Sequence, residues 1–168
     1  MNKLFSIILC LLFFSCDDGD LQIETLDFDD VDVQTCDAIN ITEASILYKI
    51  NDDEALILSL AANVLIQEVG TIEFDITATS ATKLIYRIFS DTATTSYFCA
   101  AVPPITPTVI DEIIASKGTI IITTTATGTV DTPTYSHKIE FLEITLETAQ
   151  DQRITDLTIN DFGTITTN

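Results

Sequence analysis

The chain has 168 residues, of which 26 are acidic and 7 basic, so its formal net charge is −19. Binding of a phosphate backbone needs clustered Lys and Arg, and the few basic residues here are scattered, which excludes nucleic acid as a partner. The same charge repels anionic lipid headgroups, so membrane attachment cannot come from a polybasic patch. Stiff β-branched side chains, with 25 Ile, 27 Thr and 7 Val, favour sheets over helices and predict an all-β protein.

The N-terminus has the pattern of a secretory signal peptide. Lys3 precedes an apolar run from Leu4 to Phe14, which Ser15 and Cys16 close. That run is about half of the roughly 20 residues needed to cross a bilayer, so it predicts a signal sequence and not a transmembrane helix. We therefore expect residues 1–15 to be removed from the mature protein.

A small residue followed by Cys16 resembles a bacterial lipobox, in which the thiol is acylated and the peptide is cut just before it. The acidic residues after it, Asp17, Asp18 and Asp20, resemble the export signal of Bacteroidetes-type surface lipoproteins. The resemblance implies that Cys16 carries a fatty acyl anchor such as palmitate. It also implies that residues 16–22 form a tether on an outer membrane, with the domain facing the cell exterior.

The rest of the chain, residues 23–168, has the size of a single domain. Cleavage before Cys16 would leave 153 residues and would change the net charge to −20, since it removes Lys3 and no acid. We expect one antiparallel β-sandwich with one short helix. Alternating apolar and polar residues predict its first strands: two short stretches within 26–33, a hairpin over 44–60 with a turn at Asn51 to Glu54, and a strand over 72–77.

The middle of the chain predicts a second hairpin and the helix. Lys83 to Phe89 and Thr94 to Ala100 form the hairpin, and both faces of its first strand are largely apolar, which is typical of a central or covered strand. Apolar residues then recur at helical spacing between Pro107 and Ser116. With Thr106 as a cap, Pro107 at the first position and Gly118 as the stop, we expect a short helix there.

The last third predicts strands again. These are Thr119 to Ala126, a long strand from Tyr135 to Glu147, and two short strands at Arg153 to Ile159 and Phe162 to Ile165. In the long strand the apolar residues change parity, so we expect a bulge near Phe141 and Leu142 that places five of them on one face. Those five are Ile139, Phe141, Leu142, Ile144 and Leu146.

Two cysteines remain once Cys10 is discarded with the signal and Cys16 is taken by the anchor. In an oxidising compartment Cys36 and Cys99 are expected to form a disulfide. Two buried free thiols are the alternative. A metal site is disfavoured, because His137 is the only histidine and zinc sites draw on several Cys and His ligands.

Catalysis finds little support in the sequence. A catalytic triad needs a base beside a Ser, Cys or Thr. His137 falls at the start of an ordinary strand with Lys138 after it and has no recognisable triad partners, so we interpret it as a structural or solvated residue. Two carboxylates could serve a glycosidase, but 26 acids form such pairs by chance. The acidic stretches 27–32 and 51–54 lack the spacing of a calcium loop and are interpreted as solvated, with a weak Ca²⁺ site as the alternative. No metal or cofactor is predicted.

Asp91, Thr92 and Ala93 resemble the Asp-Ser/Thr-apolar acceptor of Bacteroidetes-type O-glycosylation, which would make Thr92 the modified residue; an unmodified turn is the alternative. The chain has no Trp and 4 Tyr, a poor platform for stacking sugars. We therefore expect a lipid-anchored, non-catalytic binding or structural module whose partner is a surface protein or a glycan. The alternatives are a glycan-binding accessory protein of a nutrient-uptake system, favoured by an exposed row of Tyr, and a surface hydrolase that uses an acid pair.

Overall fold

The computed structural model describes residues 28–129, 131–148, 153–154 and 161–168. The signal peptide, Cys16 and the tether lie outside these residues, so their predictions stay predictions. In the described part of the chain, no helix has the length and apolar character needed to cross a bilayer. The strands are β1 (Ser45–Asn51), β2 (Glu54–Leu60), β3 (Gly70–Thr77), β4 (Lys83–Phe89), β5 (Val109–Ala126), β6 (Tyr135–Glu147), β7 (Arg153–Ile154) and β8 (Asp161–Thr167), and the helix is α2 (Thr95–Cys99).

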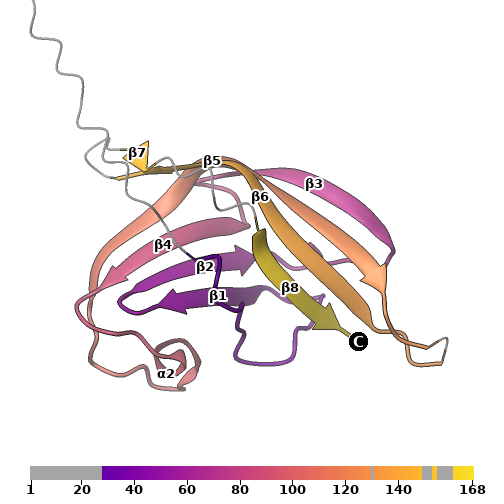
Figure 1. Cartoon of the computed structure of the whole chain (residues 1–168), viewed down its shortest axis with the longest axis horizontal. Helices are drawn as coiled ribbons and strands as arrows, with labels where there is room; N and C mark the ends of the chain where they lie inside the picture. The colour runs from indigo at the N-terminus through magenta and orange to yellow at the C-terminus, as the bar shows by residue number, and fades with distance from the viewer. Residues whose placement is uncertain (1–27, 130, 149–152, 155–160) are drawn as a thin grey trace, which may run out of the picture.

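All strand pairs are antiparallel and join in one 8-stranded sheet. The main path runs β1-β2-β4-β5-β6-β7, while β3 pairs with β5 and β8 pairs with β6. β5 and β6 are long enough to cross the whole molecule, and the sheet curls around its core as a half-barrel (Figure 1). The all-β, antiparallel prediction is confirmed. Two separate sheets are not seen, because β5 pairs with both β4 and β3 along one edge and links them.

The core lies in the hollow of the curled sheet. Leu47, Leu58 and Tyr86 reach it from the β1, β2 and β4 half, and Ile122 and Phe141 reach it from the β5 and β6 half. All five side chains are at most 2% exposed. At about 25 cal/mol per Å² of apolar surface removed from water, this burial is the main force that holds the two halves together.

The helix predicted over Pro107 to Ser116 is wrong, since β5 begins at Val109 within this segment. Helical and strand spacing both place apolar residues here, and the pairing with β4 decides between them. Tyr86 stands opposite Ile113, and Arg87 stands opposite Glu112 and forms a salt bridge with it. β-branched residues such as Ile113 also lose less rotamer freedom in a strand than in a helix.

The strand predicted at Thr94 to Ala100 is also wrong, because α2 occupies this segment. Its aromatic residues pack on the outer face of the sheet: the Phe98 ring stacks on Tyr48 at 4.3 Å, and the Tyr97 ring meets Phe89 edge-on at 4.8 Å. This cover explains why both faces of β4 are apolar. Leu84 and Tyr86 of that strand face the main core, whereas Phe89 belongs to the cluster under α2.

A bulge is present in β6, but it does not bring all five predicted apolar residues to the buried face. Glu143 takes a φ of 54°, and the β5–β6 register shifts beside it. Leu142 stays 48% exposed, so four of the five apolar residues share the buried face and the fifth does not. The strands predicted within 26–33 are replaced, over residues 28–33, by turns and irregular backbone.

Gly118 lies in the middle of β5 and not at the end of a helix. An added Cβ would collide with the Ile144 Cδ1 atom and would lie 3.2 Å from the Ile144 Cα atom on β6. The β5–β6 register shifts on both sides of this position, between Ala115 and Lys117 and between Lys117 and Thr119. Only glycine allows the two long strands to approach so closely where the sheet bends.

Candidate functional site

The two ends of the curled sheet, β1 and β8, approach each other but do not pair. Residues 28–39 fill the space between them, and we call this segment, with the facing edges of β1 and β8, the seam. The segment contacts both strands: the backbone of Gln34 exchanges hydrogen bonds of 2.8 and 3.0 Å with Tyr48 on β1. On the other side, Val33 packs against Gly163 of β8.

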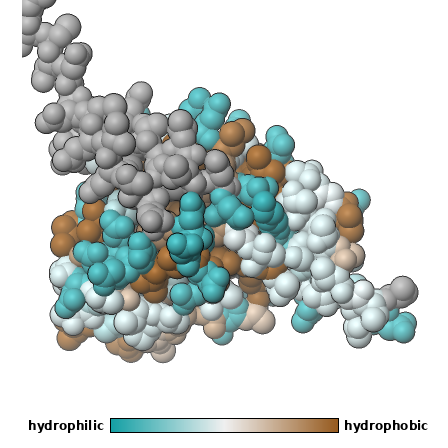
Figure 2. Space-filling model, viewed as in Figure 1, coloured by the Kyte–Doolittle hydropathy of each residue, from teal (hydrophilic) through white to brown (hydrophobic). Residues whose placement is uncertain are grey.

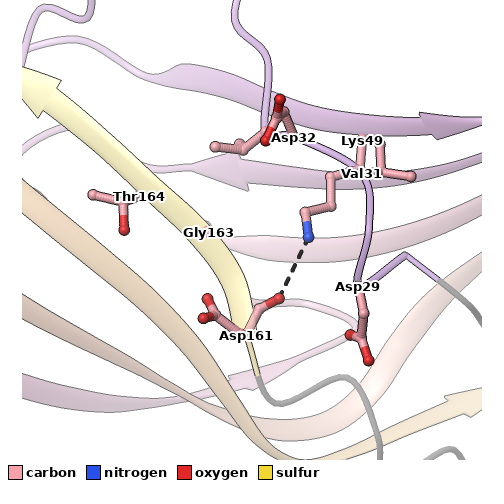
Figure 3. Close-up of a pocket in the computed structure, with 8 residues that line it drawn as sticks. Asp29, Val31, Asp32, Lys49, Asp161, Gly163 and Thr164 are labelled. Atoms are coloured by element: carbon pink, nitrogen blue, oxygen red, sulfur yellow. Dashed lines mark hydrogen bonds between the residues drawn. The ribbon is translucent and has the colours of Figure 1, made fainter.

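A buried lysine spans the seam. The Lys49 side chain is only 3% exposed, and its Nζ donates to the Phe28 carbonyl at 2.9 Å and to the Asp161 carbonyl at 3.4 Å. It thereby ties β1 to the segment and to β8 (Figure 3). Its Nζ also lies 5.7 Å from the centre of the Phe162 ring, within the range of a cation–π contact.

Carboxylates surround this lysine. Asp29, Asp32 and Asp161 line the same pocket as Lys49, which has a volume of about 810 Å³ (Figure 3). Burial lowers the pKa of Lys49 below its ordinary value of 10.5, and the three carboxylates partly offset that effect. The ammonium group of Lys49 thus supplies a cation to this acidic pocket. Among the described residues no group of three or more His, Cys, Asp and Glu side chains is placed to hold a metal ion.

A second hollow continues along β8. Residues from Thr35 to Ile39 form one wall and residues from Thr164 to Asn168 form the other, around a volume of about 750 Å³. We call it the β8 groove. A Cβ on Gly163 would lie 3.0 Å from the Val33 Cγ1 atom, so the seam is narrow there and Gly163, with a φ of 131°, allows the close contact. This contact separates the Lys49 pocket from the β8 groove.

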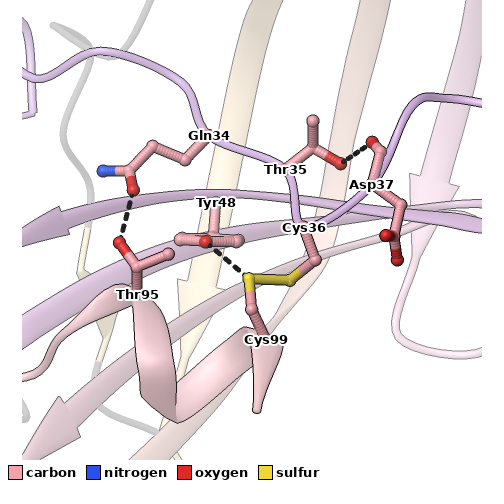
Figure 4. The surroundings of a disulfide bond; sticks show 7 residues. All are labelled: Gln34, Thr35, Cys36, Asp37, Tyr48, Thr95 and Cys99. Atoms are coloured by element: carbon pink, nitrogen blue, oxygen red, sulfur yellow. Dashed lines mark hydrogen bonds between the residues drawn. A yellow bond between two sulfur atoms is a disulfide. The ribbon is translucent and has the colours of Figure 1, made fainter. Parts of the chain in front are cut away.

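The predicted cysteine pair holds the seam segment in place. The Sγ atoms of Cys36 and Cys99 lie 2.02 Å apart, at the bonding distance of a disulfide (Figure 4). Their bond links the segment to α2, across 63 residues of sequence. The same contact region includes the Tyr48 hydroxyl, 3.0 Å from Cys99 Sγ, and a hydrogen bond of 2.8 Å from Thr95 to Gln34.

His137 is buried in the sheet, far in sequence from the seam. It is 0% exposed, and its two ring nitrogens lie 2.9 Å from the hydroxyls of Thr124 on β5 and Thr167 on β8. Burial lowers the pKa of His137 below its ordinary 6.5, so the ring is neutral at physiological pH. The histidine is therefore a structural residue that ties three strands together.

The predicted glycosylation residue Thr92 is exposed, whereas the tyrosines are buried or half-buried. Thr92 is exposed in the loop between β4 and α2, and its hydroxyl donates to Asp52 at 2.6 Å. Tyr48 and Tyr86 are 0% exposed, and the other two tyrosines, Tyr97 and Tyr135, are half-buried. The exposed row of Tyr that would favour the glycan-binding alternative is thus absent from the described residues, which include all four tyrosines.

Sequence reasoning missed the seam and Lys49. The residues of the Lys49 pocket come from three distant parts of the chain, and Lys49 was counted only as one of the scattered basic residues. Its register in β1 gave a usable signal, because Lys49 stands opposite Leu56 and shares the core face with it. Figure 2 shows hydrophilic side chains gathered over the middle of the face on which the seam opens.

No family matches the chain, and neither a curated protein nor a solved structure is similar to it.

Proposed function

We propose that this chain is a lipid-anchored module on the exterior of the outer membrane, which binds a surface partner and does not catalyse a reaction. The proposal joins two kinds of support. The N-terminal resemblance carries the address, through Cys16 and the acidic residues after it. The disulfide between Cys36 and Cys99 suits an exported, oxidising setting.

The observation that carries the non-catalytic part is the structural use of the two titratable groups best suited to catalysis. Both ring nitrogens of His137 are engaged by threonine hydroxyls in the core. The Lys49 ammonium is engaged by main-chain carbonyls. His137 is enclosed in the core, and the Lys49 ammonium, although it lines a pocket, already donates to two carbonyls. General acid–base catalysis requires a group that can exchange a proton with the reacting atoms.

The curled shape supports a binding role. The halves of the sheet face each other across one core, as the sheets of a sandwich do, and we propose that the domain acts as a sandwich-like scaffold. Such scaffolds bind ligands at their edges and loops, while the core stays rigid. The seam is the place where this scaffold offers pockets, a free strand edge and charge together.

A turnover screen tests the proposal. Purified residues 17–168 are incubated with chromogenic esters, peptides and glycosides, and we expect no rate above the buffer control. Turnover that disappears on replacing Asp29, Asp32 or Asp161 with Asn would contradict the proposal, and would establish the surface hydrolase instead. The variant Glu73→Gln serves as a matched control, because Glu73 is exposed on β3 and outside the seam.

A further inference from the structure

β8 is an end strand with an open edge. Among the described residues it pairs with β6 alone. The seam segment runs beside its other edge without a backbone hydrogen bond to it in the described part of the chain, and the β8 groove lies between them. Alternate residues of an end strand direct their N–H and C=O groups away from the sheet, where another strand can pair with them.

The groove has the dimensions of an extended peptide. Four residues of β8, Thr164 to Thr167, span about 13 Å at about 3.3 Å per residue. The exposed side chains of Thr164 and Thr166 alternate with the buried Ile165 and Thr167, so the edge is regular along this stretch. Strand addition to such an edge gains affinity from main-chain hydrogen bonds.

The acidic residues around the seam favour a partner segment of opposite charge. Asp29, Asp32 and Asp161 line the Lys49 pocket, and Asp37 lines the β8 groove. Lys49 is buried and already bonded to carbonyls. With a net charge of −19 on the whole chain, a second copy would be repelled, whereas a basic segment would be attracted.

We infer that the β8 groove binds an extended, Lys- or Arg-bearing segment of a partner protein, which adds to β8 as a further antiparallel or parallel strand. The inference rests on the proposed binding function and names its site and partner chemistry. The disulfide holds the outer wall of the groove, because Cys36 lies in that wall and Cys99 fixes it to α2.

The probe is an eight-residue peptide of alternating Lys and Val, capped at both ends. We expect it to bind the oxidised domain and to protect from hydrogen exchange those amides of Thr164 to Thr167 that face away from β6, while β3 amides do not change. Methylating one alternate set of peptide nitrogens should weaken binding at least tenfold, and methylating the other set should not. A Glu–Val peptide should not bind.

Matched variants separate specific from general attraction. Asp32→Asn with Asp37→Asn should weaken peptide binding several-fold, whereas Glu73→Gln with Asp111→Asn, which removes the same charge on β3 and β5, should not. The inference would be overturned if both pairs of substitutions weakened peptide binding equally, or if both methylated peptides bound equally well. Protection of amides at another strand edge, or dimerisation of the domain without peptide, would also overturn it. These results concern the β8 groove alone and leave the proposed function standing, because the turnover screen, the acylation test and crosslinking in cells test that function separately.

Discussion

At the residue scale, His137 shows how a polar group can stabilise an apolar sheet. Its ring nitrogens and the two threonine hydroxyls satisfy one another, so the burial of the ring leaves no polar atom without a partner there. A buried hydrogen bond of this kind contributes about 1 kcal/mol net, whereas an unsatisfied partner costs about 1–3 kcal/mol. Replacing His137 by Leu would therefore leave Thr124 and Thr167 with unpaired hydroxyls.

The protonation of His137 gives the first prediction. Its pKa is lowered in the folded protein, so the unfolded chain takes up a proton first as the pH falls below about 6.5. Well above that pH, His137 is neutral in both states and does not change the free energy of unfolding with pH. Below it, the free energy of unfolding should fall by up to about 1.4 kcal/mol per pH unit until the folded ring also titrates.

Urea titrations between pH 7.5 and 5.5 measure this slope, and His137→Asn should lose it even if the variant is less stable throughout. An NMR titration of the His137 ring provides an independent check. A ring that titrates at or above pH 6.5 in the folded domain would contradict the account.

Gly118 gives a second prediction at this scale. Gly118→Ala places a methyl group against Ile144 and should lower the free energy of unfolding by about 1–3 kcal/mol, the usual cost of overpacking. Ile144→Val removes the Cδ1 atom that the new methyl group meets, so the two substitutions together should cost less than the sum of the single effects. Additive costs in urea denaturation would show that the two residues do not collide.

At the scale of single elements, the disulfide decides how firmly the seam segment is held. Within residues 33–39 the segment forms one isolated bridge to β1, and the bond between Cys36 and Cys99 adds a covalent link. Closing a loop of 63 residues removes unfolded-state entropy equivalent to on the order of 4 kcal/mol. The segment therefore depends on oxidation more than any strand of the sheet does.

Reduction of that bond is the third prediction. A thiol reductant should lower the free energy of unfolding of residues 17–168 by a few kcal/mol, measured by urea denaturation. The double variant Cys36→Ser/Cys99→Ser should match the reduced protein and should not respond to the reductant. Two free thiols in the unfolded, unreduced domain would contradict the bond.

The elements also show what the sequence could predict. Runs of apolar and β-branched residues predicted β1 to β4, and the prediction for β6 matched its ends at Tyr135 and Glu147. The period of two is clear only where one face is exposed, as in β3. The segment Pro107 to Ser116 was assigned wrongly because its apolar spacing fits both periods, and only the partner strand β4 decides. α2 was missed because its aromatic packing and its disulfide are contacts with distant residues.

At the scale of the whole molecule, the chain combines an acidic domain with a curled sheet whose ends do not pair. The seam could not be predicted from the sequence, because its residues come from 28–39, β1 and β8 and only the curl of the sheet brings them together. The cysteine pair could be predicted, since elimination left one pairing. The net charge of −19 repels acidic molecules and attracts basic ones, which is why we propose a partner segment that carries Lys or Arg.

The anchor gives the fourth prediction. Growth of the producing cells with a labelled fatty acid should mark the protein, because acylation of Cys16 is what the lipobox resemblance implies. Cys16→Ser should abolish the label, whereas Cys36→Ser should not, because Cys36 lies in the folded domain. Equal labelling of the Cys16→Ser variant would remove the basis for a lipid-anchored address.

The central claim is that the domain binds a partner at the surface through its seam, and crosslinking in intact cells tests it most directly. A photoreactive amino acid replaces Thr166 on β8, or Glu73 on β3 as the control, in the full-length chain. The account predicts that illumination yields a covalent adduct with another protein from position 166 and none from position 73. High salt during illumination should lower the yield of that adduct. An adduct from position 73 alone, or none from position 166 with the protein correctly anchored, would contradict it.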